Sequence, residues 1–269
     1  MIDPGLWFMF LVGIAIATIA MMAGIGGAVL FAPFFMLVLK LDPLIAVGAG
    51  LTIEFFGFSS GVIGYWRKKQ INFAIVKQII VFTIPATIVG VILGRLIPAF
   101  TLQVMLALLL FYLAYQFLLK GKECLPKDPR CTGASATDGK WIVTPMTKGT
   151  SFLGGLLVGM ISAGLGELNE LTFLKKMKMP VPAASATSVF LVAMSATVGS
   201  FFHAYFLVRQ GDVSIFADVI SLLVFTVPGV ISGAQIGVIL ANIVKAALMG
   251  KFVGILFLIL GVLTFLLVI

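Results

Sequence analysis

The sequence predicts an all-α polytopic membrane protein built from two inverted repeats, each a glycine-broken, re-entrant helix pair followed by three transmembrane helices. Three observations support this fold class: the composition, the length of the apolar segments and the likeness of the two halves. Hydrophobic residues make up 61% of the 269 residues, charged residues only 10%, and the mean hydropathy is +1.20. A soluble domain carries about 25% charged residues. A chain this apolar cannot hide its surface internally, whereas helices in lipid satisfy their own backbone hydrogen bonds.

Apolar segments follow one another along the chain and are separated by short polar breaks. They cover residues 6–23, 27–39, 44–65, 74–97, 101–119, 151–163, 184–207, 215–240 and 246–269. A shorter and less apolar stretch lies at 167–178. As helices, 151–163 and 167–178 would each be about 18–20 Å long, whereas the hydrocarbon core of a bilayer is about 30 Å thick. We therefore expect this pair to form one long broken helix or a re-entrant hairpin.

One long polar break, residues 120–149, divides the chain into a first repeat at 1–119 and a second at 150–269. The break is rich in turn-forming residues and is predicted to be a linker. It also holds the two cysteines of the chain, Cys124 and Cys131. Two cysteines make neither a disulfide framework nor a zinc site.

The two halves resemble each other in sequence. "VFTIPATIVGVILG" begins at Val81 and "VFTVPGVISGAQIG" begins at Val224, and seven of the fourteen positions match. Upstream, "AGIGG" from Ala23 corresponds to "AGLGE" from Ala163 at an offset of 140. Internal repeats with glycine-interrupted segments in matching places are typical of secondary transporters, whose binding sites lie at the breaks.

The distribution of basic residues predicts how the repeats face the membrane. If each glycine-broken unit is a hairpin, 15 of the 18 basic residues lie on one side, and only Lys40, Arg95 and Arg209 lie on the other. If each unit crosses once, the split is 11 to 7. Because cytoplasmic loops are enriched in Lys and Arg, the hairpin arrangement is favoured. It makes the halves inverted, with both termini outside the cell (inner) membrane and the 120–149 loop in the cytoplasm, where its thiols would be reduced.

Several segments of the chain resemble those of a known protein family. "AGIGGAVLFAPFFMLVLKLDPLIAVGAGLT", then "GYWRKKQIN" and a helix with a central proline, are similar to the TauE/SafE family, also called TSUP, over about residues 10–268. The resemblance implies a membrane transporter, often an exporter, of sulfite, a sulfonate or another small sulfur-containing anion. The second half departs from the family's glycine-rich pattern, because Glu167, Asn169 and Glu170 follow Gly164 and Gly166.

The glycine breaks are the predicted substrate site. A break exposes backbone N–H groups at the start of the second half-helix, where the helix dipole is positive and anions bind. Glycines and small polar residues also let membrane helices pack closely, so each of these residues admits a packing role as well. The predicted substrate-binding residues are Gly26, Gly27, Gly48, Thr52, Gly164, Gly166, Asn169, Thr187 and Ser188.

Carboxylates near the second break admit three interpretations. Glu167 and Glu170 are three residues apart and therefore share a helix face. They could neutralise the helix dipole, carry a proton that couples transport, or contact an amine of a cationic or zwitterionic substrate. Glu54, near the middle of its apolar segment, is a further coupling candidate. We predict proton coupling through Glu54, Glu167 and Glu170.

Other classes are less well supported by the sequence. A passive anion channel is the nearest alternative, because opposed half-helices also line channel pores. "GFSSG" (57–61) matches a hydrolase motif around Ser59, but it lies in an apolar helix, and the single histidine, His203, is expected near the opposite end of its own helix. Arg95 is expected at an interface. We predict no catalytic residue, metal site, cofactor or nucleic-acid partner, and a homodimer is left open.

Overall fold

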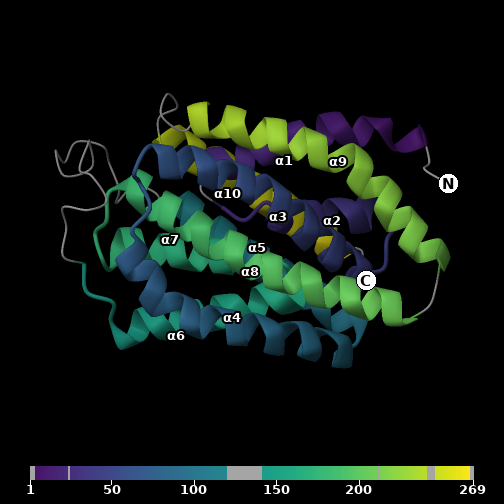
Figure 1. Cartoon of the computed structure of the whole chain (residues 1–269), viewed down its shortest axis with the longest axis horizontal. Coiled ribbons are helices and arrows are strands. Elements are labelled where there is room, and N and C mark those ends of the chain that lie inside the picture. Colours follow the sequence, from purple (N-terminus) through teal and green to yellow (C-terminus); the bar gives the residue numbers. More distant parts are fainter. Residues whose placement is uncertain (1–3, 24, 120–140, 211–212, 241–245, 267–269) are drawn as a thin grey trace.

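The computed structural model describes residues 4–23, 25–119, 141–210, 213–240 and 246–266, and it is helical throughout (Figure 1). A short 3-10 helix, Pro4–Trp7, precedes the first α-helix. The α-helices are α1 (Phe8–Ala23), α2 (Ala28–Val38), α3 (Pro43–Arg67), α4 (Phe73–Leu96), α5 (Ala99–Leu119), α6 (Pro145–Ile161), α7 (Leu165–Lys175), α8 (Val181–Gln210), α9 (Val213–Leu240) and α10 (Ala246–Leu266). The described residues contain no β-strand.

The all-α membrane fold class is confirmed. Six helices within the described residues are long and apolar enough to cross a bilayer: Gly5–Ala23, Pro43–Arg67, Phe73–Leu96, Ala99–Leu118, Pro182–Arg209 and Phe216–Leu240. α1 is one of them, although the sequence places its segment in a hairpin. The apolar part of α10, Gly250–Leu266, belongs to the shorter helices. The division into two hairpins and six spanning helices therefore stays a prediction.

α6 begins earlier than the sequence predicts. It starts at Pro145, inside the predicted linker 120–149, and spans 17 residues or about 26 Å. The Thr144 hydroxyl oxygen accepts a hydrogen bond from the N–H of Thr147 at 3.2 Å, and proline occupies the first helical position. The apolar pattern missed this turn because its residues are polar. Residues 120–140, with Cys124 and Cys131, lie outside the described residues.

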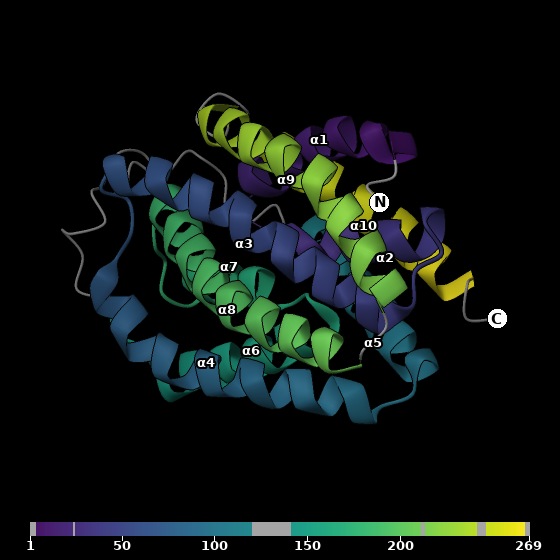
Figure 2. The ribbon, with the colours of Figure 1, turned by 45° about the vertical axis from the view of Figure 1, so that its right-hand side comes forward.

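The helices of the two halves pack in reciprocal pairs. The first helix of each half lies along the fourth helix of the other, so α1 packs on α9 and α6 packs on α4. α3 packs on α8, and α5 packs on α10. α3 and α8 run in opposite directions in both views of the ribbon (Figures 1 and 2). A twofold relation between the halves would produce this pairing, and the inverted repeat itself stays a prediction.

Glycines bring the paired helices into backbone contact. A Cβ added at Gly229, Gly233 or Gly237 of α9 would meet the carbonyl oxygens of Phe10, Ile14 and Thr18 of α1. Likewise, a Cβ at Gly155 or Gly159 of α6 would meet the carbonyl oxygens of Thr83 and Thr87 of α4. Small residues at four-residue spacing allow this approach, which supplies van der Waals contact where lipid offers no hydrophobic drive.

Basic residues gather at one end of the bundle. The end of α3 and the beginnings of α4, α6 and α8 lie at the left of Figure 1, whereas the beginning of α1 and the end of α10 lie at the right. The left-hand segments carry Arg67, Lys68, Lys69, Lys77, Lys148 and Lys178. Among the described residues, Lys40, Arg95 and Arg209 belong to the opposite end, next to the beginning of α3 and the ends of α4 and α8. This asymmetry agrees with the predicted topology, whose orientation in the membrane remains a prediction.

We expect Gly159→Ala to lower the stability of the bundle, because its Cβ would collide with the Thr87 carbonyl oxygen and lie 2.7 Å from the Val91 nitrogen. Overpacking of this kind costs about 1–3 kcal/mol. Gly149→Ala, in the same helix with nothing within 4 Å of the added Cβ, is the matched control. It should be neutral or up to about 1 kcal/mol stabilising through helix propensity. Thermal unfolding of both purified variants in one detergent measures the difference, and equal stabilities would contradict the close contact.

Candidate functional site

The two glycine breaks meet inside the bundle. The first lies between α1 and α2, and the second lies between α6 and α7. A Cβ added at Gly166 would lie 3.1 Å from the backbone nitrogen of Gly26, so the two breaks are in direct backbone contact. Gly164, before α7, has a φ of +111°, a conformation that side-chain-bearing residues rarely adopt. We call the contact of residues 25–28 with 162–170 the tip junction.

Glu167 joins the two breaks. Its Oε1 accepts a hydrogen bond from the Gly26 N–H at 2.9 Å, and its Oε2 accepts one from the Gly164 N–H at 3.0 Å. The side chain is fully buried. Glu167 is the third residue of α7, the position from which a carboxylate caps its own helix. One carboxylate therefore satisfies a backbone donor of each half.

Glu54 reaches the same junction from α3. Its Oε1 accepts a hydrogen bond from the N–H of Ala28, the first residue of α2, at 3.1 Å. A Cβ added at Gly26 would lie 3.0 Å from this oxygen and 3.1 Å from the Oε1 of Glu167, so two carboxylates flank one glycine. The other oxygen of Glu54 is buried and has no hydrogen-bond partner.

Glu170 and Asn169 complete the polar groups of α7. The Ser185 hydroxyl donates to Glu170 Oε1 at 2.6 Å, and the Ser151 hydroxyl lies 2.6 Å from the Asn169 Oδ1. The remaining atoms, Glu170 Oε2 and Asn169 Nδ2, are buried without a partner. Ser162, the left-handed residue that ends α6, also has an unpartnered hydroxyl.

Unpartnered buried polar atoms concentrate at the tip junction. In the described residues they are Glu54 Oε2, Ser162 Oγ, Asn169 Nδ2, Glu170 Oε2, Ser195 Oγ and Thr264 Oγ1. The first four belong to the junction or to the carboxylate that reaches it. Each such atom costs free energy unless something binds it, so their gathering marks a place for a proton, water or a polar ligand. No group of three or more His, Cys, Asp or Glu residues suited to a metal ion occurs among the described residues.

The predicted substrate residues fall into four places, of which the tip junction holds most. Gly26, Gly164, Gly166 and Asn169 form the tip junction itself, and the Ser188 hydroxyl donates to the Gly166 carbonyl oxygen at 2.8 Å. Gly27, at the start of α2, faces apolar packing instead: a Cβ there would lie 3.7 Å from the Phe58 ring and 3.8 Å from Ala20. Thr187 points elsewhere, because its hydroxyl oxygen accepts the Asn72 N–H at the beginning of α4.

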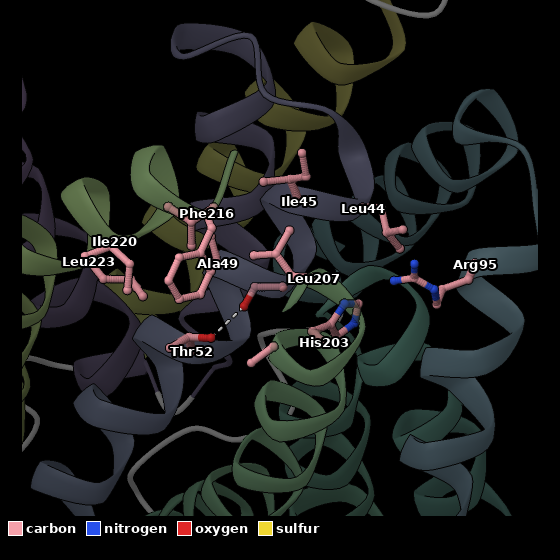
Figure 3. A pocket seen from close by; sticks show the side chains of 13 residues that line it. Leu44, Ile45, Ala49, Thr52, Arg95, His203, Leu207, Phe216, Ile220 and Leu223 are labelled. Atoms are coloured by element: carbon pink, nitrogen blue, oxygen red, sulfur yellow. Dashed lines mark hydrogen bonds between the residues drawn. The ribbon is translucent and has the colours of Figure 1, made fainter. Parts of the chain in front are cut away.

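Gly48 and Thr52 line a separate pocket of about 270 Å³ between the beginning of α3, the end of α8 and the beginning of α9 (Figure 3). We call it the α3–α8–α9 pocket. Its lining residues are Leu44, Ile45, Gly48, Ala49, Thr52, Arg95, His203, Ala204, Leu207, Phe216, Val219, Ile220 and Leu223. Apart from Thr52, Arg95 and His203, the side chains of this lining are apolar. The sequence analysis assigned Arg95 to an interface. The one signal that pointed to it is that Arg95 is among only three basic residues predicted for that side of the membrane.

The hydrolase alternative gains no support from the geometry. Ser59 lies within the continuous helix α3, without the strand–turn–helix that presents a nucleophile. The side chain of His203 packs against Gly48 of the same helix, where an added Cβ would lie 3.1 Å from the His203 Cβ. Gly48 and Ser59 are eleven residues apart, or about 16 Å along the helix. His203 Nε2 instead lies 3.3 Å from the carbonyl oxygen of Gly159.

Comparisons with known proteins agree on one family. The family model of the sulfite exporter TauE/SafE matches residues 9–264. The chain is 26% identical to the probable membrane transporter protein YjnA of Bacillus subtilis (strain 168), over 84% of this chain and 88% of that protein. It is 23% identical to the probable membrane transporter protein YunE of the same organism, over 71% and 75% of the two chains. No solved structure matches the chain.

We expect Glu167→Gln to destabilise the protein, because an amide offers one acceptor oxygen where two backbone N–H groups need one each. One donor would be left buried and unpartnered, at about 1–3 kcal/mol. Glu170→Gln is the matched control, since its retained oxygen still accepts from Ser185. Thermal unfolding should rank wild type and Glu170→Gln above Glu167→Gln. The reverse order would mean that Glu167 does not hold the breaks together.

Proposed function

The chain belongs to the sulfite exporter TauE/SafE family of membrane transporters, and we propose that it is a proton-coupled secondary transporter that exports a small sulfur-containing anion such as sulfite or a sulfonate. The observation that carries the proposal is the set of three buried carboxylates at the tip junction, two of which have an oxygen without a partner. The family and the relatives are named for transport, and this supports transport in place of catalysis.

The occupancy of the helix N-termini supports proton coupling. The N–H groups of Gly26, Ala28 and Gly164, which could otherwise hold an anion, already donate to Glu167 or Glu54. An anion approaching ionised carboxylates in a low-dielectric interior is strongly repelled. Protonation of Glu54 or Glu170 would remove that repulsion and tie movement of the anion to movement of a proton. Buried carboxylates with this role are common in proton relays of transporters.

The two free oxygens distinguish roles among the three glutamates. Glu167 uses both oxygens to hold backbone donors, so its main role is to position the tips. Glu54 and Glu170 each hold one donor and keep one oxygen free. We therefore assign proton exchange to Glu54 and Glu170. Glu167 is the neighbouring buried carboxylate whose charge acts on both.

The proposed topology follows the gathering of basic residues. The end of the bundle that carries Arg67, Lys69 and Lys178 faces the cytoplasm in our proposal, together with the 120–149 loop. Both termini then face outward from the cell (inner) membrane. The direction of transport, out of the cell, rests on the name of the family.

A substrate with an amine is the second candidate. The same carboxylates could ligate the cationic group of a zwitterion, with Glu167 and Glu170 as ligands. The unpartnered Glu170 Oε2 is the observation that favours it. A passive anion channel would give each glutamate only a structural role. Flux measurements with taurine, sulfite and sulfoacetate, with and without a pH gradient, separate these functions.

In proteoliposomes we expect wild-type protein to accumulate one of these anions when a pH gradient is imposed. Glu54→Gln and Glu170→Gln should lose gradient-driven accumulation by about tenfold or more, the scale of a coupling free energy of 1–3 kcal/mol. Anion exchange without a gradient should continue in both variants, because a neutral side chain mimics the protonated state. Asp218→Asn, which changes an exposed carboxylate of α9, is the control and should behave as wild type.

Two results would count against this assignment. Gradient-driven accumulation that persists in both glutamine variants would remove proton coupling from these residues. Wild-type flux that follows the anion's own gradient, and never exceeds it when a pH gradient is imposed, would favour the channel.

A further inference from the structure

We propose that the α3–α8–α9 pocket binds the substrate as an organic anion, with the charged head at Arg95 and an apolar carbon body against the helices. The inference rests on the proposed transport function and names the substrate class. It assigns the anion to a site separate from the tip junction. Four observations carry it: an available cation, a positioned histidine, apolar walls and the negative character of the junction.

Arg95 has no carboxylate partner among the residues that the structure describes. It lies at the end of α4 and is half-buried, and no salt bridge joins it to an acid in the described part of the chain. Its Cζ lies 4.5 Å from the centroid of the Phe206 ring. The guanidinium makes no hydrogen bond within the described part of the chain, so its N–H groups are left for a ligand. Those N–H groups can donate in pairs to two oxygens of a carboxylate or of a sulfonate group.

His203 is held in position beside this cation. Its Nε2 lies 3.3 Å from the Gly159 carbonyl oxygen, and because a carbonyl only accepts, this nitrogen is the donor. Gly48 leaves room for the ring from the α3 side. Figure 3 shows the Arg95 guanidinium pointing toward the His203 ring. Arg95 and His203 therefore lie together on one side of the pocket, and Thr52 lies apart from them (Figure 3).

The remaining walls are apolar and the space is too large for an inorganic oxyanion. Ile45, Ala49, Leu207, Phe216 and Leu223 line it from α3, α8 and α9. A volume of about 270 Å³ corresponds to roughly nine water-sized volumes of 30 Å³. Sulfite would leave most of that space unfilled. A sulfonate or carboxylate that carries several carbons would bury its body there and keep its head at Arg95.

α3 relates the pocket to the tip junction. Gly48 and Thr52 face the pocket, whereas Gly50 faces Ala28 and the Ser162 hydroxyl, and Glu54 reaches the first break. The backbone N–H donors at the breaks are taken by carboxylates, and residues 25–28 and 162–170 include no Lys or Arg, so the junction offers neither a free donor of this kind nor a cation to an anionic head. Arg95, at the end of α4, supplies a cation in the pocket on the other side of α3. The proposed anion site and Glu54 thus lie on opposite faces of α3.

The test is equilibrium binding to the purified full chain in nanodiscs, measured by calorimetry with sulfite and with linear alkanesulfonates from methane- to pentanesulfonate. We expect sulfite to bind most weakly and each added methylene to tighten binding about fourfold until the pocket is full. Arg95→Gln should weaken binding of pentanesulfonate at least about tenfold, and Arg95→Lys should weaken it less. Arg209→Gln is the matched control, because Arg209 lies near Tyr205 outside the lining, and it should change binding by less than about twofold.

A second variant tests the pocket without changing the charge of Arg95. Ala204→Phe places a ring in the pocket and should abolish the increase in affinity with chain length. Thermal unfolding close to that of wild type would show that this variant is folded. Affinity that ignores chain length, or that Arg95→Gln and Ala204→Phe leave unchanged, would overturn the pocket assignment. Absence of binding by any of these anions to wild type would overturn it as well.

Flux separates failure of this inference from failure of the proposed function. If Arg95→Gln and Ala204→Phe transport the anion like wild type, while Glu170→Gln loses coupling, the function stands and the pocket assignment is wrong. If wild type transports none of the anions, both are wrong. If chain-length-dependent binding and flux fall together in the pocket variants, both are supported.

Discussion

Backbone donors at the two helix breaks must find acceptors inside a bilayer, and the rest of the structure depends on how this is done. A broken helix is tolerated at membrane depth only where protein buries it and other groups satisfy it. Here Glu167 accepts one N–H from each half, and Glu54 accepts a third from α2. The breaks are therefore held by charge-bearing side chains in place of water or ligand, and this fixes the chemistry that the junction can perform.

The glycine contacts provide the frame that keeps those hydrogen bonds short. Backbone contact of α1 with α9 and of α6 with α4 ties the first helix of each half to the other half. The breaks follow directly after α1 and α6, so their position is set by these two interfaces. Gly166 then rests on the backbone of Gly26, where an added Cβ would lie 3.1 Å from the Gly26 nitrogen and the neighbouring backbone would have to shift slightly. Close packing and polar satisfaction thus depend on the same few small residues.

Much of the fold was readable from the sequence, because apolar length and internal likeness are local properties. The apolar segments at 44–65 and 74–97 became α3 and α4 with ends within two residues. The first turns of α6 were missed since a capped, polar helix start has no apolar signal. The glycine breaks were found, but the sequence could not show that Glu54 would reach Ala28, the first residue of α2, which lies 26 residues earlier in the chain. The pocket was missed for the same reason: Arg95 and His203 meet only through tertiary packing.

The separation of charges across α3 gives the proposed coupling a physical basis. In our proposal, a proton relieves the negative potential of the carboxylates on one side of α3, and Arg95 of α4 attracts an anion to the pocket on its other side. Because both groups act on one helix, protonation of Glu54 changes the field that an anion beside Gly48 and Thr52 experiences. A ligand can shift a conformational equilibrium only by its difference in affinity for the two states. In this proposal, proton and anion therefore need no direct contact to be coupled. It is enough that the conformational states of the bundle differ in the distance between Glu54 and Arg95, because each ligand then binds the states with different affinity.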